Sequence, residues 1–537
     1  MAHPRMSPLF SRQRPAYRSL IYLFSTLLLV FVMAACGSGG GGNANQSSSS
    51  GPKTGGELKV GLVEGVVTLD PLKSTALVDR EVMLNMYDTL VTANNKNEIE
   101  PDLATSWKLT NPTTMEFTLR SGVKFADGTP FNAQAVADNI NRILNTPSSP
   151  RHSEISAVTS VQVVDDTHID FNLKQPFAPL LAALTDRAGM ILSPAILKSD
   201  TEQQIANGVA GAGSGPFMFS SWVKGDHLTL ARNPNYWQKD SAGKALPYLD
   251  KVTYKPITNG SVRYNNLQTG TINVAQSLDP TDVASAKSNS SLIYKQIPGL
   301  SFYGLMLNTK AAPFNDVHAR HAVAWGVNRE EIVKSVFKDT AVVAQGPISP
   351  SSWAFDKTFQ PFTYDVTKAK SELSQSSSPS GFSFTLLIGG GSPLQTQEAQ
   401  FIQSELQAVG ITVNIKQETF AKILSDTESY NFQAALLGWS GRPDPDGNMY
   451  GWFHTGGGFN SMQYSNPQVD KFLEDARTSS IQSQRISDYQ QAQKQIVDDA
   501  SYIFIEHGGA PQASTANVHN FPLAPTTIMI FTNTYLS

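Results

Sequence analysis

The sequence has little cysteine and little charge, and each shortage excludes a class of protein. Its 537 residues contain one cysteine, so the chain has no internal disulfide framework and no metal site built from several cysteines. Charged residues make up 16%, the net charge is −4, and the first 35 residues contain arginines but no acid. The remainder is therefore more acidic than the whole. This argues against nucleic-acid binding, which needs surplus lysine and arginine.

Long apolar runs are also scarce: the one prominent run is Leu20–Ala35. It follows the arginines, is short for a membrane span of about 20 residues, and has the layout of a secretory signal peptide. It ends in Met33-Ala34-Ala35-Cys36, which resembles a bacterial lipobox, in which the cysteine receives the lipid. We predict a signal peptide in residues 1–35 and lipidation of Cys36. The alternatives are an uncleaved N-terminal anchor and a buried core thiol.

The segment after Cys36 lacks both charge and large apolar side chains. Gly37–Gly51 consists of glycine, serine, asparagine, glutamine and alanine, so it cannot form a core. We therefore predict that residues 36–56 are the lipidated cysteine and a flexible tether. This tether would hold a globular body on the outer side of a membrane.

The body contains enough hydrophobic and aromatic residues to fold. Hydrophobic residues make up 40% of the chain, with 27 Phe, 16 Tyr and 7 Trp. Alternating patterns predict strands, and helical spacing after Asn132 and before Gly410 predicts helices. The Ser-rich stretch 371–381 is typical of a surface loop. The class is mixed α/β. Predicted strands cover 57–63, 115–120, 161–164, 168–173 and 411–415, and predicted helices cover 133–146, 401–409 and 469–476.

Catalytic motifs are incomplete. Ser214 lacks the flanking glycines of a nucleophile elbow, because Ala212 and Pro216 occupy those positions. Ser221-Trp-Val-Lys224 fits S-x-x-K, a pattern that arises easily by chance. Asp444-Pro-Asp-Gly447 has its glycine at the wrong offset for a calcium loop. We therefore predict no enzyme, no cofactor and no metal site; a secreted lipoprotein hydrolase is the alternative from another functional class, and a surface adhesin or peptide chaperone is a third.

Four groups of segments carry a family resemblance. They are Pro101–Trp107 with Phe117–Phe131, Gly213–Phe217 with Arg232–Trp237 and Leu246–Asp250, Leu307–Asp316 with Ala324–Arg329, and Gly438–Gly447. In this order they resemble the family 5 extracellular solute-binding proteins of ABC transporters. That group includes receptors for dipeptides, oligopeptides, nickel and glutathione.

The resemblance implies a two-lobed periplasmic-binding-protein-like fold with an extra inserted domain and a hinge between the lobes. Lobe I would comprise 57–92, 201–300 and 506–537, the inserted domain II 93–200, and lobe III 301–505. The chain would cross the hinge near residues 300 and 505. A solute that touches both lobes would favour the closed state.

The resemblance also points to ligand-binding residues on lobe III. In peptide-binding relatives a Trp is followed three residues later by an Asp that pairs with the α-amino group. Here Trp439 matches, but the Asp position holds Arg442, which would bind a carboxylate or phosphate instead. Asp444 or Asp446 would then receive the amine. The alternatives are core packing for Trp439 and an internal ion pair of Arg442 with Asp444 or Asp446.

Four further residues are weaker candidates for the ligand site. Tyr303 lies near the presumed hinge, and Asn460 follows a glycine stretch. Ser214 and Gly215 would offer backbone N–H groups to an anion, although a tight turn explains them equally well. Surface or packing roles are the alternatives for Tyr303 and Asn460.

The resulting hypothesis is a lipid-anchored, monomeric receptor outside the cytoplasmic membrane. It would capture a small solute, for which a short peptide is the preferred candidate, and deliver it to an ABC permease. Within the same receptor role the alternative ligands are an oligosaccharide, an opine-like conjugate or a metal chelate.

Overall fold

The computed structural model describes residues 51–509 and 511–537. The predicted signal peptide, Cys36 and most of the tether lie outside these residues. Across the described ranges, no helix is long and apolar enough to cross a membrane. Residues 52–537 form one unit by their contacts, and helices and strands alternate through it as the sequence predicts.

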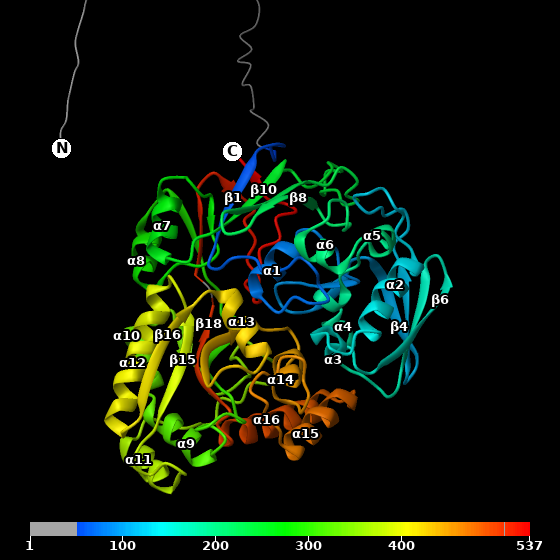
Figure 1. The fold of residues 1–537 in the computed structure, drawn as a ribbon. Coiled ribbons are helices and arrows are strands. Elements are labelled where there is room, and N and C mark those ends of the chain that lie inside the picture. Colours follow the sequence, from blue (N-terminus) through cyan, green and yellow to red (C-terminus); the bar gives the residue numbers. More distant parts are fainter. Residues whose placement is uncertain (1–50, 510) are drawn as a thin grey trace, which may run out of the picture. The chain divides into compact units, whose positions relative to one another are not determined.

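The first large sheet has seven strands that come from three separate stretches of the chain (Figure 1). Its central strand β1 pairs in parallel with β10 and β11, and the other neighbours are antiparallel. Helix α7 packs against β11 and β19, and α8 packs against β12. The elements are, in spatial order, β12 (Leu292–Lys295), β19 (Gln512–Thr515), β11 (Val274–Ala275), β1 (Glu57–Leu62), β10 (Lys251–Pro256), β9 (His227–Arg232) and β8 (Phe217–Val223), with α1 (Leu77–Met83), α7 (Gly260–Gln268) and α8 (Pro280–Ser288).

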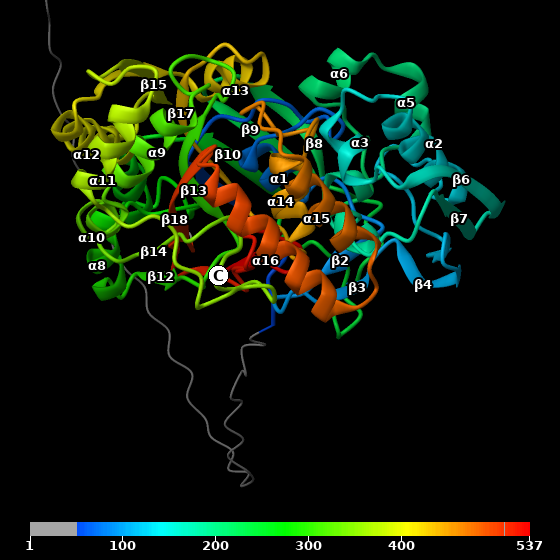
Figure 2. The same ribbon diagram turned by 90° about the horizontal axis from the view of Figure 1, so that it is seen from below.

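The second large sheet has six strands, and the late strand β18, drawn red, lies within it among green and yellow elements (Figure 1). Its spatial order is β14 (Ala341–Val343), β18 (Tyr502–Gly508), β13 (Phe302–Leu307), β17 (Ala434–Trp439), β15 (Ser383–Gly389) and β16 (Thr412–Glu418). Helices α15 and α16 lie side by side (Figure 2). The helices of this part are α9 (Val317–Gly326), α10 (Arg329–Ser335), α11 (Val366–Gln375), α12 (Pro393–Val409), α13 (Phe420–Glu428), α14 (Asp446–Phe453), α15 (Pro467–Thr478) and α16 (Gln482–Asp498).

A third, four-stranded sheet is inserted between β1 and β8. All its pairs are antiparallel, and α2 packs against β6 and β7. Its order is β4 (Ala104–Asn111), β5 (Thr114–Leu119), β7 (His168–Leu173) and β6 (Val158–Asp165). The same stretch contains the pair β2 (Val91–Ala93) and β3 (Ile99–Pro101), the helices α2 (Ala133–Leu144), α3 (Pro150–Glu154), α4 (Leu180–Ala183), α5 (Pro194–Ser199) and α6 (Glu202–Asn207), and the 3-10 turn η1 (Arg187–Gly189). A last pair joins β20 (Val518–His519) to β21 (Tyr535–Leu536).

The chain passes between the two large sheets twice, after β12 and after β18, and the two crossings contact each other. Ser301 Oγ donates to the carbonyl of Gly508 at 2.7 Å, and His507 Nδ1 donates to the carbonyl of Ser301 at 2.7 Å. A Cβ at Gly299 would lie 2.3 Å from the Gly508 carbonyl oxygen, so glycine is needed for this approach. The crossings therefore connect the sheets at a narrow, backbone-paired junction. The predicted lobe boundaries stay predictions.

Two predicted helix ends are confirmed. Asn132 caps α2 by accepting a hydrogen bond from the Ala135 N–H at 3.1 Å. Gly410 ends α12 in the left-handed conformation with a φ of 103°, which glycine adopts without steric cost.

The predicted loop at 371–381 is wrong in its first half. Residues up to Gln375 belong to α11, which Asp365 caps by accepting from the Lys368 N–H at 3.0 Å. Leu373 and Ala369 are buried on the inner face of this helix. Tertiary burial therefore overrides the low helix preference of the serines.

Candidate functional site

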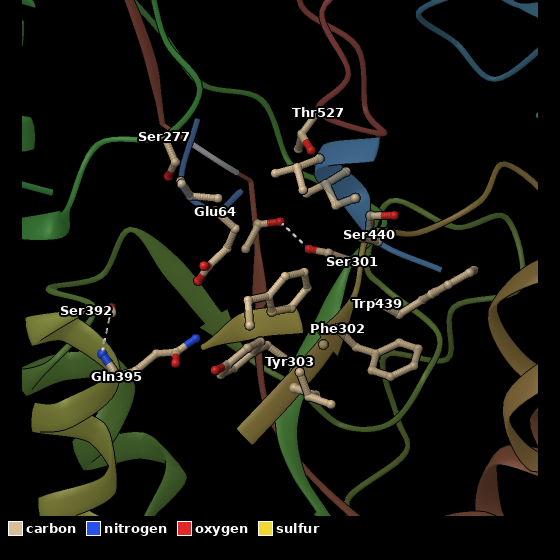
Figure 3. A pocket seen from close by; sticks show the side chains of 18 of the residues that line it. Glu64, Ser277, Ser301, Phe302, Tyr303, Ser392, Gln395, Trp439, Ser440 and Thr527 are labelled. Atoms are coloured by element: carbon tan, nitrogen blue, oxygen red, sulfur yellow. Dashed lines mark hydrogen bonds between the residues drawn. The ribbon is translucent and has the colours of Figure 1, made fainter. Parts of the chain in front are cut away.

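A cavity of about 400 Å³ lies between the two large sheets. One wall comes from β13, β17, α12 and α13, and the other from the chain after β1, the start of α1 and the chain after β11. Gly508 and Gly509 of the second crossing also line it. Figure 3 shows Glu64, Ser277 and Thr527 on one side of this space and Phe302, Tyr303 and Gln395 on the other. Its size falls within the range of about 300–1,000 Å³ that is usual for small-molecule sites.

An aromatic cluster forms one end of the cavity. Phe302 and Trp439 are direct partners on the antiparallel strands β13 and β17. The Trp439 ring lies 4.8 Å from that of Phe459 and 5.7 Å from that of Trp452, centroid to centroid. The indole Nε1 donates to Asn448 Oδ1 at 3.1 Å, which fixes the ring orientation. Trp439 is 4% exposed and lines the cavity, so it packs in the core and borders the site at once.

Tyr303 lies beside this cluster on the same strand. A Cβ at Gly438 would lie 2.5 Å from its ring, so the absence of a side chain at Gly438 makes room for the phenol. The hydroxyl donates to the carbonyl of Leu436 at 3.3 Å. Burial, with nearby Glu398 next in importance, raises the pKa of Tyr303 well above its ordinary value. The phenol is therefore neutral at physiological pH.

All five carboxyl groups of the cavity lining have raised pKa values, chiefly because they are buried; they are Glu64, Asp279, Glu398, Glu428 and Glu506. The pKa of Glu64, which follows β1, rises to about 7, with Arg263 opposing the shift. The pKa of Glu506 on β18 rises to about 8. Burial and the charge of Glu506 together raise the pKa of Glu398 on α12 well above its ordinary value. Such shifted groups are characteristic of functional sites.

A buried arginine cluster lies behind the aromatic end. Asp186 Oδ2 lies 2.6 Å from Nε of Arg80 and 3.0 Å from Nε of Arg442. Asp186 precedes η1 in the inserted part, Arg80 belongs to α1, and Arg442 follows β17. Burial alone would raise the pKa of Asp186, but the arginines around it, Arg442 first, hold that pKa well below its usual range. The carboxylate thus joins three parts of the fold.

Of the predicted loop residues, the structure places Arg442 in this cluster and pairs Asp444 and Asp446 with other arginines. The Arg442 guanidinium stacks on Trp439, with its Cζ 4.2 Å from the ring centroid, and pairs with Asp186 rather than with Asp444 or Asp446. Asp444 accepts from Arg485 at 2.7 and 2.9 Å, and Asp446 accepts from Arg477 at 2.7 and 2.9 Å. Arg442, Asp444 and Asp446 line a separate hollow of about 30 Å³ and not the large cavity. Their contact with a ligand stays a prediction.

Of the four weaker candidates for the ligand site, one lines the large cavity and three do not. Tyr303 lines the cavity, whereas Asn460, Ser214 and Gly215 do not belong to its lining. The Asn460 side chain donates to the carbonyls of His454 and Tyr464 at 3.0 and 2.7 Å. Ser214 Oγ donates to Asp88 at 3.0 Å, and the Gly215 N–H donates to the carbonyl of Met86 at 3.0 Å. Each of these contacts holds a loop in place.

Sequence reasoning missed the carboxylates of the cavity, although their signals were present. Glu398 stands between Leu394 and Ile402 on the inward-facing stripe of α12, where an apolar residue is expected. Glu506 ends the apolar run Tyr502-Ile-Phe-Ile in β18. Each of these two glutamates occupies a position of a helix or strand where the sequence pattern predicts an apolar side chain, and this mismatch is the signal by which they could have been found.

Comparison with known proteins places the whole body in one family. The family described as bacterial extracellular solute-binding proteins, family 5 Middle, matches residues 98–460. The probable D,D-dipeptide-binding periplasmic protein DdpA of Escherichia coli (strain K12) is 32% identical over 487 residues, which cover 88% of this chain and 93% of DdpA.

Two solved structures share the fold at 27% identity. The periplasmic binding protein DppA of Helicobacter pylori, in complex with the peptide STSA, has a TM-score of 0.82 and covers 90% of this chain and 98% of its own. The oligopeptide-binding protein AppA of Bacillus subtilis, in complex with a nonapeptide, has a TM-score of 0.84 and covers 91% and 100%. The predicted two-lobed fold is thereby confirmed, and the chain belongs to the family 5 bacterial extracellular solute-binding proteins.

Proposed function

We propose that this protein is a lipid-anchored receptor that captures a short peptide or a similar charged solute by lobe closure and delivers it to an ABC permease. The observation that carries the proposal is the cavity of about 400 Å³, whose walls come from both large sheets. The peptide in complex with H. pylori DppA and the dipeptide in the name of DdpA support the ligand class.

The geometry supports capture by closure. Thr75 Oγ1, on the side of the first sheet, donates to Glu428 on α13 at 2.9 Å, so the two sides touch at the rim of the cavity. A solute between the walls makes its full set of contacts only when the lobes are closed. It therefore favours the closed state through its differential affinity. The narrow double crossing beside Ser301 and Gly508 is where the chain would bend.

The ligand class is tested with the full chain purified in mild detergent and freed of bound solutes by reversible unfolding. Peptides of two to nine residues, including D-alanyl-D-alanine and Ser-Thr-Ser-Ala, are added and unfolding is followed by scanning calorimetry. A peptide at 100 times its dissociation constant stabilises the folded state by about 2.7 kcal/mol, which raises Tm by a few degrees (~2–4 °C). If no peptide raises Tm while an oligosaccharide or metal chelate does, the peptide proposal is wrong.

Trp439 is proposed as a ligand contact as well as a core residue. We expect Trp439→Phe to weaken binding of the best peptide of that panel by about tenfold, because the smaller ring leaves part of the ligand surface without contact. Titration calorimetry measures the effect. Trp222→Phe is the matched control, since Trp222 lies on β8 away from the cavity lining. Equal affinities for the two variants would leave Trp439 with a packing role alone.

The lipid anchor is proposed from the sequence and tested separately. Cys36 follows the apolar run directly and is the single cysteine of the chain. We expect Cys36→Ser to remove lipidation, since the hydroxyl cannot replace the thiol in that modification. The variant should then either be released into the aqueous phase or stay in the detergent phase as an unprocessed precursor of higher mass that retains residues 1–35. Wild-type mass and partitioning in the variant would contradict the anchor.

A further inference from the structure

Two buried carboxylates lie on one wall of the cavity, and a third reaches toward them from the other. Glu398 on α12 is 1% exposed, Glu506 on β18 is 9% exposed, and both line the cavity. Glu64, from the side of the first sheet, also lines it. A Cβ built at Gly389, the last residue of β15, would lie 3.5 Å from Glu64 Oε1. The Glu64 carboxylate therefore extends to the second sheet.

Two of these carboxyl groups, Glu398 and Glu506, each have an oxygen that the described residues around them do not satisfy. Among the described residues, Glu398 Oε1 and Glu506 Oε2 have no hydrogen-bond partner. The two neighbouring phenols cannot supply one, because Tyr303 and Tyr502 donate their protons to the carbonyls of Leu436 and Leu437. A buried ionised carboxylate without a donor is costly, so near neutral pH the pair stays protonated unless a molecule in the cavity supplies donors to its ionised form.

The charges around the cavity favour a cation as that molecule. The described lining contains the carboxyl groups of Glu64, Asp279, Glu398, Glu428 and Glu506 and a single positively charged side chain, Arg263. That guanidinium is already engaged, because its NH2 atom lies 3.4 Å from Asp279 and its other nitrogens donate to the carbonyls of Ser277 and Ile257. Carboxyl groups thus outnumber cationic groups in the described lining, and a cation that enters the cavity favours their ionised form.

We infer that Glu398 and Glu506, with Glu64 opposite, form a subsite for a protonated amine or guanidinium group of the solute. The inference rests on the proposed receptor function and narrows its ligand class to solutes that bring a cationic group into the cavity. The group is the α-ammonium of a peptide or a basic side chain. Either would donate charge-assisted hydrogen bonds to the unsatisfied oxygens.

The subsite also explains how the solute promotes closure. Closing the lobes would bring Glu64 toward Glu398 and Glu506, and where these carboxyls are ionised their like charges repel in a region of low dielectric. In the closed state, a cation between the carboxylates replaces this repulsion by attraction. In the open state, where water separates the walls, the cation interacts with the carboxylates much more weakly. The difference between the two states is what drives a two-state closure.

The binding of a fixed cation should strengthen as the pH rises. The raised pKa values of Glu64, about 7, and Glu506, about 8, leave both groups largely protonated at pH 6 and ionised at pH 8.5. The other titratable groups facing this patch are Tyr303 of β13, Tyr502 of β18, Arg263 of α7 and Asp279 before α8. The phenols stay neutral and the guanidinium stays charged over this range, so the carboxyls determine the slope.

The test uses four probes with the full chain in detergent. Agmatine supplies a non-peptide cation, and Ala-Lys-Ala supplies both peptide amines. Its Nε-acetyl-lysine and N-terminally acetylated forms each remove one of them. We expect one of the two acetylations to weaken binding about 10- to 100-fold, which identifies the amine that occupies the subsite. Agmatine should bind at least tenfold more tightly at pH 8.5 than at pH 6.

Isosteric variants assign the effect to the residues. Glu398→Gln and Glu506→Gln should each weaken binding of the preferred cationic probe by about tenfold or more and reduce its preference over the acetylated form. Glu405→Gln is the matched control, because Glu405 is a partly buried carboxyl on the same helix that accepts from the Asn328 N–H at 2.9 Å and is not in the cavity lining. This control should bind like the wild type.

The outcomes separate the subsite from the receptor function. Equal binding of charged and acetylated peptides, or unchanged binding by both glutamine variants, overturns the subsite while the peptide receptor stands. Binding of agmatine with loss in Glu506→Gln, but no binding of any peptide, supports the subsite and overturns the peptide class. If none of the cationic probes binds at 5 mM, the subsite is overturned.

Discussion

Asp186→Asn is expected to lower the free energy of unfolding by about 3–5 kcal/mol at pH 7, because it removes the anion from a buried group of arginines. Arg80 and Arg442 each place Nε within 3.0 Å of its carboxylate. Arg187 lies 3.9 Å away at the other oxygen. Asparagine keeps the size of the side chain but none of its charge. Urea unfolding of the wild type and the variant measures the difference.

The pH dependence of this difference has a definite sign. The arginines hold the folded-state pKa of Asp186 below its unfolded value of about 3.9, so the stabilisation is complete above that pH. It is lost as the pH falls through the folded-state value. The gap between wild type and variant should therefore be constant from pH 5 to 8 and shrink below about pH 4.

A matched control is Asp226→Asn, since Asp226 is an exposed carboxylate whose charged partner among the described residues is the neighbouring His227. It should change the unfolding free energy by less than about 0.5 kcal/mol. If Asp186→Asn behaves like Asp226→Asn, the arginine cluster is held by other interactions. A second variant, Asp186→Asn combined with Arg442→Gln, should recover part of the loss because it removes one of the uncompensated charges.

The local parts of the fold could be predicted from the sequence because their causes are local. Asn132 is a side-chain cap followed by apolar residues at helical spacing, and Gly410 supplies the left-handed end of α12. The helix at 366–375 was missed because its serines favour loops and its inner face is defined by packing against distant elements. The inward position of Leu373 appears only when the fold is known.

The partners of the charged site residues could not be predicted in the same way. The sequence offers Asp444 and Asp446 as the nearest acids to Arg442, but the fold pairs Arg442 with Asp186, which is 256 positions earlier. Asp444 and Asp446 pair instead with Arg485 and Arg477, which lie on helices α16 and α15. Sequence distance is therefore a poor guide to ion pairs in a fold whose sheets are built from separate stretches of chain.

The double variant Glu398→Gln, Glu506→Gln is expected to be more stable than the wild type at pH 8.5 and equally stable near pH 5, once bound solutes are removed. Burial raises the folded-state pKa of Glu506 to about 8, against about 4.3 in the unfolded chain. A carboxyl whose folded-state pKa is raised stabilises the fold only while it is protonated. Its contribution is complete below the unfolded pKa and is lost as the pH rises through the folded pKa.

The size of the effect follows from the pKa difference. At about 1.36 kcal/mol per unit, ionising Glu506 in the folded state costs about 3–5 kcal/mol at pH 8.5, and Glu398 contributes in the same direction. Urea unfolding followed by tryptophan fluorescence at pH 5, 7 and 8.5 measures it. The wild type should lose stability steadily over this range and the double variant much less.

Glu98→Gln is the control, since Glu98 is exposed near β3 and should follow the wild-type curve. Parallel pH curves for the double variant and the wild type would show that these carboxyls have donors in the folded protein, and the cation subsite would lose its basis. If instead the wild type loses more stability than the double variant as the pH rises, the two carboxyls lack donors in the folded protein, as the cation subsite requires. Two carboxyls that destabilise the fold at pH 8.5 give up stability at that pH, and holding a cation between the two walls is a function that glutamine cannot provide.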